Sequence, residues 1–240
     1  MKKLAGALLI AFGVITSFKG AMDADEKILN LGVGSIFLGL IFLAFSGRKE
    51  SLDFVLSPYI SLFRKISNSL KLSNAIYIPP CVSLPNGGVF VPLHEDFDLD
   101  LGKIDDETVF ITDVGREKEL GILLPSFGSE LLKAYEDYSE INFAGAGISV
   151  VDYASSVLRS LNLARSVTAE EDGNFLKIKV EGMKVKDCSR ECEIFACPIC
   201  ASILLSVAKG SGELLAVRRF DVGERIEIVA EKIGGVDRWM

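Results

Sequence analysis

The chain has 240 residues, of which 49% are hydrophobic and 25% are charged, and its formal net charge at pH 7 is −7. This length leaves room for one domain with a proper core in addition to any anchor. Residues 51–240 hold 20 basic against 29 acidic residues, which argues against a nucleic-acid surface and against a broad polybasic contact with anionic lipid.

Two uncharged apolar runs stand at the start of the chain. They are Leu4–Phe18 and Ile28–Ser46, and nine residues, Lys19–Lys27, separate them. At about 1.5 Å per residue, the second run covers about 28 Å, which is close to one hydrocarbon core. The first run reaches about 24 Å when its flanking lysines are included. Because the link is too short for a domain, the sequence predicts a transmembrane helical hairpin over residues 1–50.

Basic residues flank the hairpin at both of its open ends. Lys2 and Lys3 precede the first run, and Arg48 and Lys49 follow the second. Since positive charge stays inside, the sequence predicts a cell-membrane protein with two spans and with both termini in the cytoplasm. A cleaved signal peptide is the alternative for the first run, although no clean A-x-A site precedes Asp23.

Glycines recur at heptad spacing within the two runs. They are Gly6, Gly13 and Gly20 in the first run and Gly32 and Gly39 in the second. Small residues on one face let helix backbones approach closely, and a period of seven favours a left-handed crossing. This pattern predicts close packing within the hairpin, or a homo-oligomer formed through Gly6, Gly13, Gly32 and Gly39. The remaining interpretation is that glycine is simply common in membrane helices.

Residues 51–73 are predicted to form a juxtamembrane amphipathic helix or linker. Ser57-Pro58 is typical of a helix start. One face of the helix then carries Tyr59, Phe63, Ile66 and Leu70. Such a helix lies on the membrane surface or packs onto the domain that follows. Because apolar stripes usually face a core, we favour packing onto the domain.

Residues 74–240 are predicted to form one cytoplasmic α+β domain with a largely antiparallel sheet and three to four helices. The expected strands are 76–80, 89–92, 108–112, 120–124, 166–170, 175–180, 214–220 and 225–231, and the expected helices are 125–139, 149–163 and 198–209. Asn86-Gly87 between two apolar runs is a strong hairpin signal. The prolines near the first two strands predict that these strands lie at sheet edges.

Four of the five cysteines lie within 13 residues, at Cys188, Cys192, Cys197 and Cys200. Four thiolates are typical of a zinc or iron–sulfur site, but this spacing matches neither the two-knuckle zinc pattern nor the ferredoxin run. A second interpretation is a redox dithiol formed by Cys197-Pro198-Ile199-Cys200 at a helix start. The third interpretation is structural disulfides or inert thiols. The sequence leaves these three interpretations open.

An acidic segment carries Asp96, Asp98, Asp100 and Glu107 at the spacing of a calcium loop. Leu101 occupies the position that requires glycine, so the alternation of apolar and acidic residues favours a half-buried strand.

Two further features carry weaker signals for chemistry. His94 is the one histidine, and no motif marks a nucleophile for it. The loop 143–147 lacks the third glycine and the lysine of a phosphate-binding loop, so we interpret it as the entry to a helix.

The hairpin together with the late segment Cys197–Ile203, C-P-I-C-A-S-I, resembles uncharacterised archaeal membrane-anchored proteins with a two-helix hairpin and a late CPIC segment. The resemblance implies archaeal origin and a membrane location, and it implies nothing about mechanism.

An anchor without paired catalytic groups predicts a non-enzymatic, membrane-tethered binding or scaffolding module. Its partners would be the lipid bilayer and a protein, with no nucleic acid, no catalytic residue and no cofactor. The alternative is a membrane-associated thiol-redox or metal protein, with zinc or an iron–sulfur cluster, that uses the cysteines from Cys188 to Cys200. A weaker third option is a small-molecule sensor with a cleft between the sheet and its helices.

Overall fold

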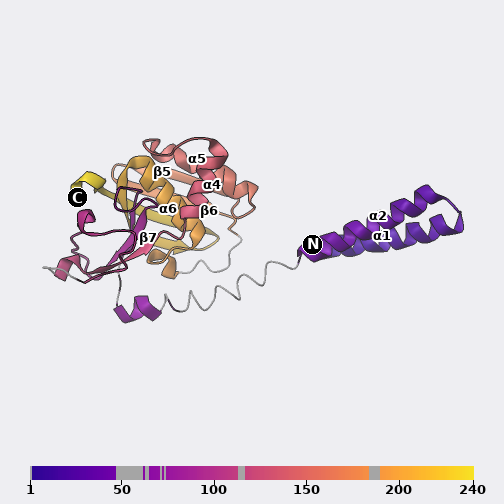
Figure 1. The fold of residues 1–240 in the computed structure, drawn as a ribbon, viewed down its shortest axis with the longest axis horizontal. Coiled ribbons are helices and arrows are strands. Elements are labelled where there is room, and N and C mark those ends of the chain that lie inside the picture. The colour runs from indigo at the N-terminus through magenta and orange to yellow at the C-terminus, as the bar shows by residue number, and fades with distance from the viewer. Residues whose placement is uncertain are drawn as a thin grey trace. The chain divides into compact units, whose positions relative to one another are not determined.

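A computed structural model describes residues 2–46, 62, 65–70, 72, 74–112, 117–183 and 190–240. The chain divides into two compact units, Met1–Leu62 and Phe63–Met240 (Figure 1). The division falls inside the predicted juxtamembrane segment 51–73. Each unit is described below by itself.

The first unit is an antiparallel hairpin of α1 (Lys2–Met22) and α2 (Glu26–Ser46). Ala24 has a φ of 49°, a left-handed conformation that ends α1 within one turn. The Asp25 carboxylate then accepts a hydrogen bond of 2.9 Å from the backbone N–H of Lys27 and so caps the start of α2. The predicted hairpin is therefore present, with a link even shorter than the sequence suggested.

The heptad glycines lie between the two helices of this hairpin. All five, at positions 6, 13, 20, 32 and 39, are buried. A Cβ atom on Gly39 would lie 2.9 Å from the carbonyl oxygen of Gly6, closer than real Cβ atoms come to backbone. Gly34, which does not follow the heptad spacing, has nothing within 4 Å of such an atom. The glycines that we expected to serve either the hairpin or an oligomer thus line the contact inside the hairpin.

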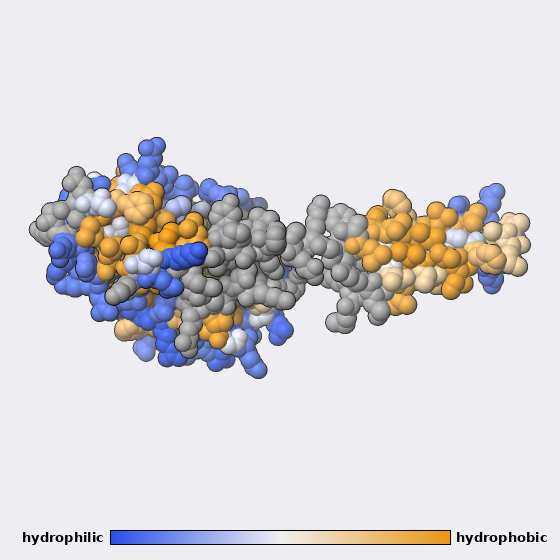
Figure 2. Space-filling view, turned by 90° about the horizontal axis from the view of Figure 1, so that it is seen from below, coloured by the Kyte–Doolittle hydropathy of each residue, from blue (hydrophilic) through white to orange (hydrophobic). Residues whose placement is uncertain are grey.

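The outer surface of the hairpin carries large apolar side chains (Figure 2). Among the described residues, one helical stretch, Ala5–Met22, is by length and composition apolar enough to cross a membrane, as an anchor or as a signal sequence does. Within those residues α2 does not meet the same criterion. The prediction of two spans is therefore supported for the first helix only.

The second unit contains an eight-stranded sheet in the part of the chain that the structure describes. The strands have the order β3-β4-β2-β1-β7-β8-β6-β5, and every neighbouring pair is antiparallel. Their bounds are β1 (Ile76–Ile78), β2 (Gly88–Pro92), β3 (Phe110–Ile111), β4 (Gly121–Pro125), β5 (Ser166–Asp172), β6 (Phe175–Glu181), β7 (Glu213–Val222) and β8 (Arg225–Gly235). The predicted α+β class and antiparallel sheet are confirmed.

The positions of β1 and β2 within the sheet differ from the prediction. We expected the neighbouring prolines to place these strands at edges, but β1 lies between β2 and β7, and β2 lies between β1 and β4. Pro79 and Pro80 come after the last residue of β1, and Pro92 is the last residue of β2. Because no proline interrupts the ladder inside a strand, no central hydrogen bond is lost.

Three helices cover one face of the sheet: α4 (Ser129–Ser139), α5 (Val150–Ser160) and α6 (Pro198–Ser211) (Figure 1). Alternation along the strands directs Tyr77 and Val89 to the core beneath these helices, while Ile76 and Phe90 face a smaller core on the opposite side. Most side chains of α6 are buried because α4, α5 and the sheet surround it.

The segment before β1 packs onto this unit where it is described. Ile66 lies against the main core and Leu72 is buried in it, whereas Leu70 is exposed. For this part of the predicted amphipathic helix, the structure supports packing onto the domain. Tyr59 and Phe63 lie outside the described residues.

Candidate functional site

The start of α6 positions two of the predicted site cysteines. Cys197 is the N-cap, with φ −59° and ψ 156°, and Pro198 occupies the first helical position. The carbonyl oxygen of Cys197 accepts the first helical hydrogen bond, 2.8 Å from the backbone N of Ala201. Proline suits this position because its missing N–H is not needed there. Cys200 therefore falls in the first turn of the helix, where it is fully buried.

The third described cysteine of the cluster, Cys192, lies in the short 3-10 helix η4 (Arg190–Glu193). It is 5% exposed and packs in the same core as Cys200. Cys188 lies outside the described residues. The fifth cysteine, Cys81, packs against the smaller core on the other face of the sheet, so it does not join this group.

Two buried tyrosines lie beside these cysteines. Burial raises the pKa of Tyr77 well above its usual value, and the nearby thiols of Cys200, Cys197 and Cys192 raise it further. Three of the four predicted site cysteines therefore lie within electrostatic range of one phenolic hydroxyl on β1. This relation crosses more than 110 residues of sequence, and no local pattern indicates it.

The second tyrosine, Tyr135 on α4, is hydrogen-bonded to α6. Its hydroxyl lies 2.7 Å from Ser202 Oγ, which itself donates to the carbonyl oxygen of Ile199. Burial raises the pKa of Tyr135, the hydrogen bond with Ser202 opposes that shift, and the thiols of Cys200 and Cys197 add to it. The hydrogen bond between Tyr135 and Ser202 thus joins α4 to α6 inside the apolar core.

A metal site at these cysteines requires more ligands close together than the described residues provide. Within 74–112, 117–183 and 190–240, no three His, Cys, Asp or Glu side chains lie close enough together to hold an ion. A four-thiolate zinc or iron–sulfur site would need Cys188, so that hypothesis stays a prediction.

Comparison with models of known protein families, with curated protein sequences and with solved structures found no match. The resemblance to archaeal membrane-anchored proteins therefore stays a prediction, and function has to be argued from geometry.

The acidic segment is neither a strand nor a group of converging carboxylates. Asp96 forms an ion pair with Lys118. Asp100 caps the 3-10 helix η1 (Leu101–Lys103) through a 3.0 Å hydrogen bond from Gly102. The predicted alternation is nevertheless visible in burial, since Leu99 and Leu101 enter the smaller core. The expectation of a strand is wrong because Asp100 starts a helical turn there instead.

The two weaker candidates occupy separate places. His94 is exposed in the loop after β2. The loop 143–147 leads into α5 through the 3-10 helix η3 (Gly147–Ser149), as expected. Its first N–H, at Phe143, donates to Glu136 Oε1 over 2.9 Å, and Glu136 also forms an ion pair of 2.6 Å with Lys209.

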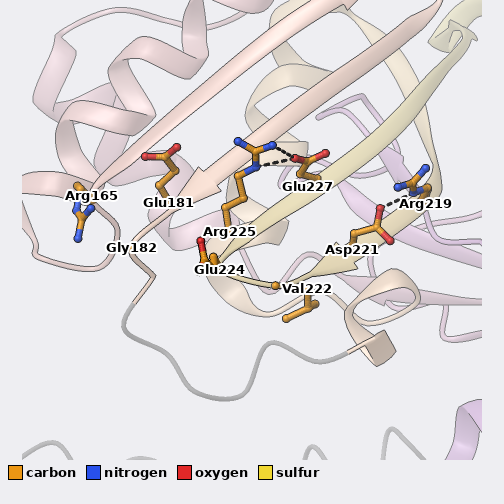
Figure 3. Close-up of a pocket in the computed structure, with 10 residues that line it drawn as sticks. Arg165, Glu181, Gly182, Arg219, Asp221, Val222, Glu224, Arg225 and Glu227 are labelled. Atoms are coloured by element: carbon orange, nitrogen blue, oxygen red, sulfur yellow. Dashed lines mark hydrogen bonds and ion pairs between the residues drawn. The ribbon is translucent and has the colours of Figure 1, made fainter.

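The structure also shows an open hollow that sequence reasoning missed. It has a volume of about 740 Å³ and lies at the β7–β8 turn and the end of β6 (Figure 3). Arg225 pairs with Glu227 over 2.6 Å, and Arg219 pairs with Asp221. With three arginines and four acidic residues in its lining, the hollow has no net positive charge that would favour an anion. The alternating charged residues in the sequence of the β7–β8 hairpin were the feature that could have indicated this hollow.

Proposed function

We propose that the protein is a membrane-tethered cytoplasmic binding or scaffolding module. The observation that supports this best is the apolar outer surface of the hairpin, on a unit separate from a compact α+β unit. Exposed apolar surface on this scale is costly in water and is typical of contact with lipid. The side chains that form it include Leu8, Phe12, Val14, Ile15, Phe18, Leu31, Val33, Phe37, Leu38 and Leu40.

Two properties of the hairpin support insertion of both helices. After Lys27, α2 has no charged residue up to Ser46. Two hydroxyl groups bond within their own helices, Thr16 Oγ1 to the carbonyl of Phe12 over 2.6 Å and Ser35 Oγ to that of Leu31 over 2.9 Å. Hydrocarbon offers no other partner for such groups, so these two hydrogen bonds favour insertion of both helices.

The basic flanks support a cytoplasmic position for residues 63–240. Lys2, Lys3, Arg48 and Lys49 all lie at the open end of the hairpin in sequence, while the turn carries Asp23 and Asp25. Short flanking segments rich in lysine and arginine stay in the cytoplasm. The acidic turn then faces the exterior, and the α+β unit faces its partners inside the cell.

Anchoring is tested by placing charge on the outer surface of the hairpin. Ile15 and Phe37 are 70% and 66% exposed, and we expect Ile15→Asp with Phe37→Asp to move the full chain from the carbonate-resistant membrane fraction into the soluble or aggregated fraction. Phe175→Asp makes the same kind of change at a 48% exposed residue of β6 and should leave the protein in the membrane. Extraction of the unmodified chain by carbonate would overturn the proposal.

Orientation is tested by labelling intact cells with a membrane-impermeant maleimide. Single cysteines are introduced at Ala24 in the hairpin turn and at Glu224 in the β7–β8 turn, both exposed. We expect Ala24→Cys to react from outside and Glu224→Cys to react only after lysis. The reverse pattern would place the α+β unit outside the cell.

A further inference from the structure

The first turn of α6 places two cysteines on one side of a helix. Cys197 is the N-cap and Cys200 lies three residues later, and residues three apart are neighbours on a helix surface. Cys197 is half-buried, whereas Cys200 has 0% of its surface exposed. Of the two cysteines, Cys197 is therefore the one that a reactant from solvent can reach.

A second relation places the two sulfurs in the same region. The thiols of Cys197 and Cys200 both raise the pKa of Tyr77 on β1 and of Tyr135 on α4. Because both thiols act on the same two buried hydroxyl groups, both sulfurs lie within electrostatic range of Tyr77 and Tyr135. This relation depends on the packing of α6 against α4 and the sheet, so it is independent of the helical spacing.

The helix start also favours chemistry at Cys197. The Cys197 side chain makes no capping hydrogen bond, but the partial positive charge of the first helical turn favours a thiolate at the N-cap. The thiolate is the reactive form in exchange with a disulfide. Pro198 fixes the first turn, which holds Cys197 in place relative to Cys200.

We propose that Cys197 and Cys200 form a redox-active dithiol that exchanges with a disulfide substrate. Cys197 is the attacking thiol and Cys200 is the resolving thiol. The substrate class is a disulfide with at least one accessible sulfur, because only Cys197 of the pair reaches solvent. The proposal goes beyond membrane anchoring and does not depend on it.

The exchange proceeds in two balanced steps. The Cys197 thiolate attacks one sulfur of the substrate, the substrate S–S bond breaks, and one half leaves as a thiolate while the other half stays bound to Cys197. Cys200 then loses its proton and attacks the Cys197 sulfur, which forms the Cys197–Cys200 disulfide and releases the second half. The two cysteines lose two electrons, and the substrate disulfide gains two electrons and two protons to give two thiols.

The test uses the full chain in detergent, equilibrated with mixtures of reduced and oxidised glutathione. After acid quenching and alkylation, mass mapping identifies which cysteines are linked. We expect Cys197 and Cys200 to become linked to each other, reversibly and with one midpoint. In Cys200→Ala the second step is blocked, so glutathione should accumulate on Cys197. In the Cys197→Ala variant, Cys200 is the remaining thiol of the pair. Its rate of modification by glutathione should be at least tenfold lower than the rate at Cys197 in the Cys200→Ala variant.

Controls keep the test independent of folding. Cys81→Ala removes a half-buried cysteine on the other face of the sheet and should leave the midpoint unchanged. Circular dichroism and the fluorescence of Trp239 check each variant, and Cys200→Ser provides a second substitution if Cys200→Ala does not fold. The proposal is overturned if Cys197 and Cys200 do not become linked at any glutathione ratio. It is also overturned if their link resists reduction, or if both single variants react equally fast.

Discussion

Gly13 and Gly32 face each other across the N-terminal hairpin, and a Cβ atom on Gly13 would lie 2.7 Å from the carbonyl oxygen of Gly32. Backbones this close leave no room for a side chain, so the two helices can pack only where both glycines are kept. The contact repeats one heptad away at Gly6 and Gly39. The glycine period therefore sets how closely the two helices lie.

Gly13→Leu is expected to separate the helices, because its side chain would overlap the backbone of α2. Gly34→Leu is the matched control, since a Cβ there meets nothing within 4 Å. The measurement is disulfide crosslinking between cysteines introduced at Ile10 and Leu43, near the glycine contact. Crosslinking should fall at least fivefold for Gly13→Leu and stay unchanged for Gly34→Leu. Equal crosslinking in both variants would show that the glycines do not set the helix spacing.

The hydrogen bond between Tyr135 and Ser202 is expected to stabilise the contact of α4 with α6. Ser202→Ala leaves a buried phenolic hydroxyl without this partner, which should lower the free energy of unfolding by about 1–3 kcal/mol. Tyr135→Phe removes that hydroxyl as well, so the double variant should cost less than the sum of the two single variants. Ser206→Ala is the control, because the Ser206 hydroxyl bonds to the carbonyl of Ser202 in its own helix.

Trp239 provides the readout for these unfolding measurements. It is the single tryptophan of the chain and stacks on Phe97, with ring centroids 5.7 Å apart. Denaturant titration followed by its fluorescence therefore reports on the α+β unit. Strict additivity of Tyr135→Phe and Ser202→Ala would show that the two groups do not interact.

Glu140→Gly is expected to raise the stability of the α+β unit by about 0.5–1 kcal/mol. Glu140 ends α4 with a φ of 55°, a left-handed conformation that glycine adopts without steric cost. Glu140→Ala keeps the Cβ atom and serves as the control, because it tests whether loss of the carboxylate alone changes stability. A shift of the unfolding midpoint that is equal in both variants would contradict the explanation from backbone strain.

Stability of the loop around η1 is expected to fall in acid. The hydrogen bond from Lys103 lowers the pKa of Asp100 below 3.8, and the hydrogen bond from Thr108 similarly lowers that of Asp105. A carboxyl group with a lowered pKa in the folded state contributes stability above its unfolded value, and this contribution is lost as the pH falls through the folded value.

The stabilisation of this loop by the Asp100 and Asp105 carboxylates is therefore expected to decrease as the pH drops below about 4. Hydrogen exchange of the backbone amide of Gly102, which donates to Asp100, should accelerate over this pH range after correction for intrinsic rates. Asp100→Asn should remove most of the pH dependence at this amide. An unchanged pH profile in that variant would assign the effect to another group.

Local sequence patterns predicted the hairpin, two of the turns and the start of α6. The two apolar runs and their glycines specified a close hairpin, because the heptad period directs small residues to one face. The turns at Asn86-Gly87 and Gly173 specified two antiparallel pairs, since glycine tolerates the backbone conformation that each turn needs. The proline at position 198 marked the start of α6.

Which distant segments meet is visible in the folded structure alone. β1 pairs with β7 through Ile76 and Ala216, which places β1 inside the sheet and Tyr77 beneath α6. The approach of Cys192, Cys197 and Cys200 to that tyrosine has no local signature. The periodicity of apolar residues indicates which face of a helix or strand is buried. The segment that packs against this face depends on the packing of the whole core, so it cannot be read from a local pattern.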